Sequence, residues 1–449
     1  MIRRTAAGAV SAVSCLAFSG TVLAPTLNSY PAYLGGPAHT SYVPTATTFT
    51  VANASGAHSI WTWTPSGTLN ASPAVNAGVI YIGSENGDFY AINATTGAVK
   101  WTKSLKIADC SKAGIVSSAT VAKDPVSGKL TVYVGAADHY LYALNAATGA
   151  TIWRTLIGST KAAYYNWASP TIANGYVYYG VATDCNEAGY DGLVSLNQHT
   201  GAQVGRYYTS GSSTVEGASV YTAAAVAPDG SVFITTGDDN GTPGTDATAI
   251  VKLAGGTLAR LGGYQIPGLY GKNSDFNASP TLFMMGTTPM VGACNKDGVF
   301  YALTQASLNA NQTSTAWQIQ LGIPPAPKTF AFCGGSADYD GTHLFVGADA
   351  TTTGAPPGSM YELTTSGAIV WETSLSTGPV VGTPSLDGSS VLAVPTYNDT
   401  GGMSAVYLMD KADGSILKTI SYADPIFAQP VYADGELVVA GSNLQAYVP

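Results

Sequence analysis

The chain has 449 residues and a formal net charge of −9, and only 10% of its residues are charged whereas 46% are hydrophobic. Because an acidic surface repels phosphate backbones, this composition argues against nucleic acid as a partner. The chain is rich in glycine and tyrosine, with 52 and 27 residues, and has no long Glu/Lys/Ala-rich stretch. These features favour strands and tight turns in one large repeat domain or in two or three ordinary domains.

Residues 1–24 have the pattern of a secretory signal peptide. Arg3 and Arg4 precede an apolar run that continues to about Ala24. A single membrane anchor and a lipoprotein attached at Cys15 are the alternatives. The run is short, is broken by Gly and Ser, and continues past Cys15. We therefore expect a secreted or extracytoplasmic protein with no membrane span in its mature form.

A phrase of about fifteen residues recurs along the chain. It reads GDFYAINATTGAVKW at 87–101 and HYLYALNAATGATIW at 139–153, and degraded copies begin at Tyr190, Ala247, Asp297, Gly358 and Ser404. A small, apolar phrase precedes each copy, as in ASPAVNAGVIYIG from Ala71. Each unit of about 45–55 residues thus predicts four short strands, and such repeats are typical of a β-propeller.

The count of repeats predicts eight blades. The last unit ends in NLQAYVP without a fourth strand, whereas HSIWTWTPSG at 58–67 resembles a fourth strand that has no unit of its own. We expect this segment to join the last unit and close the ring, which leaves no large open sheet edge. The predicted organisation is a signal peptide (1–24), a lead-in segment (25–57) and a single propeller (58–449).

Two residue types carry further expectations for this propeller. Tryptophans recur at the blade ends and are expected to pack against neighbouring blades; they are Trp101, Trp153, Trp317 and Trp371. The five histidines lack metal-ligand spacing, and we expect His139 and His199, in turn or strand-end segments, to be exposed to solvent.

Four cysteines follow the signal segment, namely Cys110, Cys185, Cys294 and Cys333. An even number in an exported chain is compatible with two disulfides, for which three pairings are possible. If they pair, we favour Cys294 with Cys333 and Cys110 with Cys185, since each pair would span neighbouring blades. No C-x-x-C or C-x-x-C-H motif occurs, which argues against a zinc ribbon, a thioredoxin-type site and covalently attached haem.

The repeated phrase YALNAATGATIW resembles the pyrroloquinoline quinone (PQQ) repeat of quinoprotein-dehydrogenase propellers. The resemblance covers nearly the whole mature chain, and YPAYLGGPAHTSY at 30–42 resembles the family's lead-in. The wording ASPTLF and NKDGVFYAL is closest to the secreted polyvinyl-alcohol-dehydrogenase-like branch. The resemblance implies an all-β, eight-bladed propeller. It implies less about chemistry, because non-catalytic relatives also keep the repeat.

In the enzymes of this family, PQQ lies in a central funnel over a Ca²⁺ ion, which polarises the quinone and is held by oxygen ligands. NEAGYDG resembles the family's E-x-G-x-x-G segment, which implies Glu187 as a metal ligand. FITTGDDN places Asp238 where the family has a metal-binding asparagine. A hydrated polar turn is the alternative explanation of both segments.

Two segments match the family's catalytic and quinone-binding positions with one important departure. KNSDFNASP resembles a D-x-D-F segment whose first Asp is the catalytic base, but this position is Asn273, so Asp275 is the remaining candidate. CNKDGVFYAL implies that Asn295 and Lys296 contact the quinone. EGASVYTAAAV places Tyr221 at the position where the family has a tryptophan that stacks below the cofactor. A tyrosine ring can also stack there, but over a smaller area.

Two functions remain open on this basis. The first is a dehydrogenase that oxidises an alcohol or a polymer hydroxyl with PQQ and Ca²⁺ and passes electrons to a separate acceptor. The second is a non-catalytic propeller that binds a protein or polysaccharide partner. The NKDG and NEAGYDG segments favour the first. Asn273, Tyr221 and the lack of the vicinal cysteine pair found in several family members favour the second.

Overall fold

The computed structural model describes residues 29–105, 114–158, 163–165, 167–184, 191–215, 217–238, 245–269, 274–323, 333–350, 356–398 and 400–449. The predicted signal peptide, Cys110, Cys185, Glu187 and Asn273 lie outside these ranges. The signal peptide and the domain boundaries therefore stay predictions. Within the described ranges, no helix has the length and hydropathy needed to cross a bilayer.

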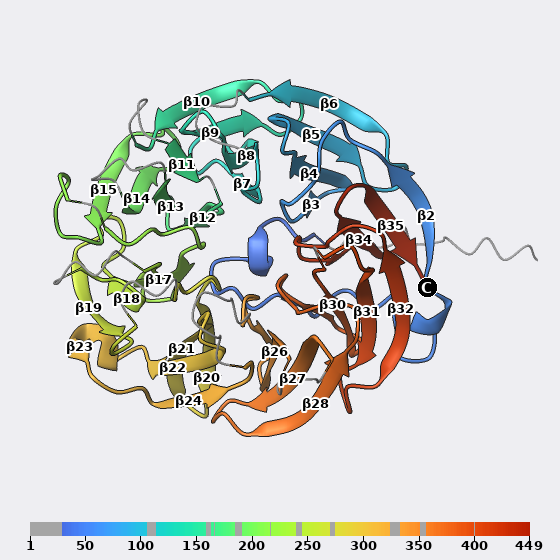
Figure 1. The fold of residues 1–449 in the computed structure, drawn as a ribbon. Coiled ribbons are helices and arrows are strands. Elements are labelled where there is room, and N and C mark those ends of the chain that lie inside the picture. Colours follow the sequence, from blue (N-terminus) through green and yellow to red (C-terminus); the bar gives the residue numbers. More distant parts are fainter. Residues whose placement is uncertain are drawn as a thin grey trace, which may run out of the picture.

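The described strands form eight sheets arranged around a central axis, as Figure 1 shows. This confirms the predicted all-β, eight-bladed propeller. The first three blades follow the four-strand pattern from the axis outward, and β11 adds to the third. They comprise β3 (Ala74–Asn76), β4 (Val79–Gly83), β5 (Asp88–Asn93), β6 (Val99–Ser104); β7 (Thr120–Lys123), β8 (Leu130–Gly135), β9 (Tyr140–Asn145), β10 (Thr151–Leu156); β12 (Thr171–Ala173), β13 (Tyr176–Asp184), β14 (Gly192–Asn197), β15 (Gln203–Tyr208) and β11 (Ala163–Tyr165).

Blades four to six repeat the same order, and one strand from an insertion joins blade four. They comprise β16 (Ala225–Val226), β17 (Val232–Thr235), β18 (Ala249–Leu253), β19 (Arg260–Gln265) and the inserted β23 (Asn311–Gln312); β20 (Thr281–Met285), β21 (Thr288–Cys294), β22 (Val299–Thr304), β24 (Trp317–Gln320); β25 (Asp338–Tyr339), β26 (His343–Asp349), β27 (Gly358–Thr364) and β28 (Ile369–Leu375). The short 3-10 helix η3 (Ser307–Asn309) lies in the same insertion as β23.

The last two blades contain strands from both ends of the chain. They comprise β29 (Ser385–Asp387), β30 (Val391–Pro395), β31 (Ser404–Asp410), β32 (Ile416–Tyr422) and β1 (Tyr42–Val43); β33 (Val431–Ala433), β34 (Glu436–Ala440), β35 (Leu444–Val448) and β2 (His58–Trp63). Strand β2 pairs antiparallel with β35, with His58 opposite Val448 and Trp63 opposite Leu444. The predicted closure of the ring by residues 58–67 is therefore confirmed for this strand.

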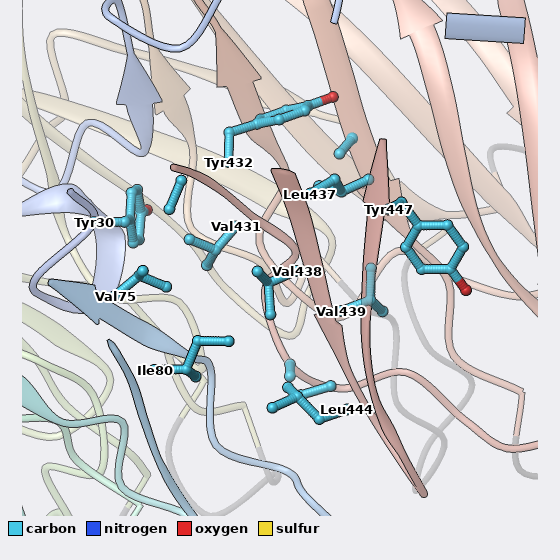
Figure 2. Close-up of a cluster of buried hydrophobic side chains, with 14 of the residues drawn as sticks. Tyr30, Val75, Ile80, Val431, Tyr432, Leu437, Val438, Val439, Leu444 and Tyr447 are labelled. Carbon is cyan, nitrogen blue, oxygen red and sulfur yellow. The ribbon is translucent and has the colours of Figure 1, made fainter. Parts of the chain in front are cut away.

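The blade that closes the ring is held by a continuous apolar core. Val438 and Leu444 from the C-terminal strands lie in one buried cluster with Val75 and Ile80 of the first blade and with Tyr30, as Figure 2 shows. Residues from both ends of the chain thus share one interior. Because burial of apolar area is the main driving force of folding, this cluster explains why the ends stay paired.

Tryptophans connect neighbouring blades as predicted. In each case the indole nitrogen donates a hydrogen bond to a backbone carbonyl of the next blade, at 2.7–3.2 Å; the donors are Trp61, Trp101, Trp153, Trp317 and Trp371. Gly149 of the second blade lies under the Trp101 ring with a φ of 70°, and a Cβ there would come within 2.8 Å of that ring. The turn glycine of the repeat is thus required both by its backbone conformation and by the close tryptophan.

Replacing Trp101 with alanine is expected to lower the free energy of unfolding by about 3 kcal/mol. The substitution removes a large ring packed between two blades and one of the two donors to the carbonyl of Ala146, the other being the Tyr81 hydroxyl. Denaturant unfolding measures this loss. Trp101→Phe, which keeps most of the ring contact and removes only the indole donor, should lose about 1 kcal/mol. Equal losses in the two variants would contradict the packing argument.

Hydrogen bonds to serine hydroxyls connect the segments that precede the innermost strands of neighbouring blades. The backbone nitrogen of Ser72 donates to Ser118 Oγ (2.8 Å), that of Ser118 to Ser169 Oγ (3.0 Å), and that of Gln429 to Ser72 Oγ (2.9 Å). These serines belong to the small phrase that precedes each repeat. A small polar residue at this position therefore connects one inner strand to the next.

The lead-in segment passes through the centre of the ring (Figure 1), where the 3-10 helix η1 (Tyr33–Gly35) lies. Between residues 30 and 49 it contacts the first strand of each blade. The contacts run from Tyr30 to Val75, Pro31 to Val121, His39 to Thr171, Pro37 to Val226, Ala38 to Leu282, Thr40 to Tyr339, Val43 to Asp387 and Phe49 to Tyr432. The segment, followed by η2 (Ala54–Gly56), thus fills part of the axis before β2 begins.

The expected exposure of His139 is wrong. Its side chain is only 4% exposed, and burial lowers the pKa of its imidazole. Its backbone has a φ of 71°, so the turn directs the residue inward although the surrounding sequence is typical of a surface turn. His199 remains partly exposed, and its Nδ1 lies 2.9 Å from Asp124 Oδ2.

Candidate functional site

The structure brings together four of the predicted site residues that it describes. Tyr221 precedes β16, Asp238 follows β17, Asp275 precedes β20, and Lys296 lies in the turn between β21 and β22. They come from four loops, which lie before β16, after β17, before β20 and between β21 and β22, in the fourth and fifth blades. Loops of this kind vary without disturbing the strands, so they can carry a site on a constant scaffold.

The centre of this site is an ion pair between Lys296 Nζ and Asp275 Oδ2. The exposed fractions of the two side chains are 15% and 11%, so the pair is largely shielded from water. The backbone nitrogen of Lys296 also donates to the carbonyl of Asp275, at 3.0 Å. Two contacts therefore hold the turn before β22 against the loop before β20.

A hydrogen bond from the backbone of Asp238 satisfies the second oxygen of the Asp275 carboxylate. The backbone N–H of Asp238 donates to Asp275 Oδ1 at 2.8 Å, so each carboxylate oxygen of Asp275 has a donor from the protein. Burial raises the pKa of Asp275, but attraction and hydrogen bonding by Lys296, together with the Asp238 contact, lower it more, so the net pKa lies below 3.8. A lowered pKa makes Asp275 a weak general base at neutral pH.

Tyr221 lies beside the two carboxylates. Burial and the charges of Asp275 and Asp238 raise the pKa of its phenol well above 10, so the hydroxyl stays protonated. Its oxygen is buried and forms no hydrogen bond of ordinary geometry with a described residue, but Asp275 is near enough for hydrogen bonding to contribute to the raised pKa. The hydroxyl is therefore a donor beside two carboxylates, and an oxygen-rich ligand bound here would compete with Asp275 for it.

One aromatic residue at this site, Trp167, was not predicted from the sequence. Trp167 lies edge-on to Tyr221, with ring centroids 6.0 Å apart, and 45% of it is exposed. The available signal was its position, since Trp167 directly precedes ASP at the start of a unit, whereas the structural tryptophans end their units. An exposed tryptophan next to a buried tyrosine widens the aromatic surface at the site.

Asn295 has both ends of its amide bonded to the backbone. Its Nδ2 donates to the carbonyl of Ser274 at 2.7 Å, and its Oδ1 accepts from the nitrogen of Asp297 at 3.0 Å. The residue is fully buried. It thus fixes the position of Lys296 relative to Asp275, and direct contact with a cofactor stays a prediction.

The described residues fit the two implied ligands unequally. Lys296 and the Tyr221 hydroxyl are suitable donors for a quinone that carries several carboxylates. Among the residues that the structure describes, no group of three or more Asp, Glu, His or Cys side chains could hold a metal ion. Asp275 already accepts from Lys296 and Asp238, so metal ligation would depend on Asp238 and on Glu187, which lies outside the described residues.

One disulfide anchors the turn that carries Lys296. Cys294, the last residue of β21, is bonded to Cys333 in the segment before β25, which confirms this predicted pair. The other predicted pair lies outside the described residues. The disulfide connects the fifth blade to the sixth, two residues before Lys296.

The ring of eight four-stranded blades, with its site in the loops, defines a propeller of PQQ-repeat blades. Residues 23–242 and 304–444 match the PQQ_2 family model, whose description is outer membrane protein assembly factor BamB. Since the match covers well over half of the chain, the chain belongs to this family of PQQ-repeat propellers.

Three relatives show the range of proteins to which the chain is similar. Quinoprotein alcohol dehydrogenase PedH of Pseudomonas putida is 27% identical over 255 residues, which are 56% of this chain and 38% of that protein. Outer membrane protein assembly factor BamB of Moranella endobia is 32% identical over 124 residues, 26% of this chain and 30% of that protein. The matched regions thus span well under half the length of these relatives.

The solved structure of quinohemoprotein alcohol dehydrogenase from Comamonas testosteroni has the same fold. The TM-score is 0.72 at 16% identity, and the alignment covers 94% of this chain and 80% of that one. At this identity the likeness shows the fold alone. The function must therefore be argued from the site.

Proposed function

We propose that this protein binds PQQ at the Lys296 site and oxidises an alcohol or a polymer hydroxyl. The observation that supports the proposal is the shielded pair of Lys296 and Asp275 beside the buried Tyr221 hydroxyl. The similarity to a quinoprotein alcohol dehydrogenase supports it further. A bound quinone would supply the oxidant, since its reduction to the quinol takes up the two electrons and two protons that an alcohol loses when it becomes a carbonyl.

In this proposal the residues of the chain bind and orient rather than act as a strong base. Lys296 would contact the quinone oxygens, and the Tyr221 hydroxyl would donate to a second oxygen. Asp275 would hold the Lys296 ammonium in place, because its carboxylate already accepts from Lys296 and Asp238. Ca²⁺, or another hard cation, would be held by Asp238 and Glu187.

The proposed location is outside the cytoplasm. The apolar segment within residues 1–24 supports export. The Cys294–Cys333 disulfide also supports it, since disulfides persist in oxidising compartments. A separate electron acceptor would then have to meet the protein there.

A second candidate function is binding of a protein partner without catalysis. The matching family description and the Moranella endobia relative, both of an outer membrane assembly factor, favour it. Asn273 at the position of the family's base favours it as well. Cofactor binding distinguishes the two candidates.

Titration of the purified protein with PQQ, with and without Ca²⁺, tests the proposal. At 100 times its Kd, a ligand that binds only the folded state stabilises it by about 2.7 kcal/mol, so the melting temperature should rise together with a change in quinone absorbance. Lys296→Ala should abolish both changes relative to its own cofactor-free form. Lys411→Ala, which removes a lysine paired with Asp340 at another site, should keep them. No shift at saturating PQQ would contradict the proposal.

A further inference from the structure

The outer wall of the propeller loses its tryptophans at two successive blade junctions. In the first blade, Trp101 lies opposite Ala91 of the third strand. The same register position holds Gly205 in the third blade, opposite Ser195, and Gly262 in the fourth, opposite Lys252. The wall between β15 and β19 therefore lacks the indole rings that fill five of the junctions between described blades. The seventh blade, with Lys418 opposite Leu408, lacks such a ring as well.

A second departure from the repeat occurs at the same place. Twelve residues, 305–316, separate β22 from β24, whereas five, 94–98, separate β5 from β6 in the first blade. This insertion contains β23, which pairs parallel with β19, with Asn311 opposite Gly263 and Gln312 opposite Tyr264. Figure 1 shows β15, β19 and β23 along one stretch of the outer wall.

A groove of about 710 Å³ lies along this stretch of the wall, lined by residues of β15, β19 and the inserted β23. Its lining includes Arg206, Tyr208, Asp246, Arg260, Gln265 and Gln312. This volume lies within the range of about 300–1,000 Å³ that is typical of small-molecule sites. The groove goes beyond the proposed function, because it lies on the outer wall and its lining shares no residue with the site around Lys296.

The charged groups of the groove are engaged by the protein itself. Arg260 makes a bidentate pair with Asp246, at 2.6 and 2.7 Å, and its Nη1 donates to Asn311 Oδ1 at 2.7 Å. Arg206 donates to the carbonyl of Ile157 at 2.7 Å, and its guanidinium lies 5.0 Å above the Tyr208 ring. The charge of Arg260 is thus neutralised by Asp246, and Arg206 is held by a carbonyl and a ring, so the groove presents a single fixed cation rather than the cluster that would select an anionic chain.

The other polar side chains that line the groove are neutral. They are amides and hydroxyls at Gln265, Asn311, Gln312, Thr209, Thr245 and Thr313. Side-chain amides and hydroxyls both donate and accept hydrogen bonds, and so do the repeated hydroxyls of a sugar chain. Because about half of the lining is polar and the net charge of the chain is −9, a lipid or a nucleic acid fits the groove poorly.

We propose that this groove binds a neutral polysaccharide chain. Tyr208 supplies an aromatic ring at the groove, Gln265 and Gln312 line it from the neighbouring strands, and the locked Arg260–Asp246 pair keeps the surface pre-organised. Asp246 lies in the loop between β17 and β18 that also carries Asp238. A chain held here would thus lie near the loops of the candidate site without depending on a cofactor.

Affinity electrophoresis through gels that contain soluble glucans, mannans or xylans tests the proposal, and calorimetry with the matching oligosaccharides measures the affinity. The wild-type protein should be retarded by at least one neutral polysaccharide. Tyr208→Ala should weaken binding at least tenfold. Thr313→Trp, which places a large ring at an exposed position of the groove, should abolish it without changing the melting temperature.

Tyr140→Ala is the matched control for these variants. Arg154 lies 4.5 Å above the Tyr140 ring in the second blade, so this control removes the same kind of tyrosine outside the groove. It should bind as the wild type does. Absence of binding to every neutral polysaccharide, binding only to an acidic polysaccharide, or binding that both groove variants retain would overturn the proposal.

Discussion

Replacing Lys296 with methionine is expected to lower the free energy of unfolding at pH 7 by about 3–5 kcal/mol. The substitution leaves the Asp275 carboxylate, in a residue that is only 7% exposed, without its counter-charge. The Asp238 N–H is then the one hydrogen-bond donor to this carboxylate among the contacts described above. Denaturant unfolding of the cofactor-free protein measures the loss directly.

The double variant Asp275→Asn/Lys296→Met separates the cost of the unpaired charge from the cost of lost packing. An amide at position 275 can still accept from Asp238, so the double variant should recover most of the stability that Lys296→Met loses. Losses that simply add would contradict a coupled pair. Circular dichroism must show that each variant still forms the strands.

The contribution of the Asp275–Lys296 pair to the free energy of unfolding should decrease at acidic pH. The folded-state pKa of Asp275 lies below its ordinary value of 3.8, so the unfolded chain binds more protons between these two values. The stability that the pair contributes is therefore complete above about pH 4 and is lost as the pH falls through the folded-state pKa. The difference in unfolding free energy between the wild type and Lys296→Met should begin to narrow at a higher pH, because burial without the counter-charge raises the pKa of Asp275 in the variant and this carboxylate is protonated first.

The fold was predictable because each repeat carries its own local signals. Turn glycines such as Gly149 and blade-end tryptophans such as Trp101 recur at fixed offsets, and each reports a contact that is made again in the next blade. The missing fourth strand of the last unit predicted closure by β2. In a repeat protein, the packing contacts between neighbouring blades therefore appear as a periodic pattern of residues in the sequence.

The lead-in segment was not predictable in this way. Most of its contacts with the inner strands run through backbone groups of residues such as Pro37 and Ala38, which place no constraint on the residue type. Among the contacts named above, only those of His39 and Phe49 use side chains. Leu34, His39 and Ser41 have positive φ values although none is a glycine. Tertiary contacts decide the conformation here, and the local sequence gives no sign of it.

The candidate site was predictable as a set of residues and not as a geometry. The resemblance indicated Lys296, Asp275, Asp238 and Tyr221, but the ion pair joins loops of different blades, and spacing along the chain does not determine it. The outer groove was not predicted from the sequence, because the sequence feature near it is the lack of a tryptophan in two successive blades. Gly205 and Gly262 stand where other blades have tryptophan, and this becomes visible only from the strand register.

Removal of the Cys294–Cys333 disulfide by replacing both residues with alanine is expected to destabilise the protein by about 4 kcal/mol. The two cysteines are 39 residues apart in the chain, and closing a loop of this length restricts the unfolded state by about that amount. Denaturant unfolding of the wild type and the double variant, both without a reducing agent, measures the loss, because a reducing agent would also cleave the predicted Cys110–Cys185 pair. A double variant as stable as the wild type would contradict the prediction.

This disulfide is expected to affect the geometry of the candidate site as well as the overall stability. Cys294 ends β21, and the next two residues are Asn295, which bonds to Ser274, and Lys296, which pairs with Asp275. Without the bond to Cys333, one side of this turn loses its anchor on the sixth blade. The coupling energy between Asp275 and Lys296 should therefore be smaller in the Cys294→Ala/Cys333→Ala background. An unchanged coupling energy would mean that Asn295 alone is sufficient to position the turn.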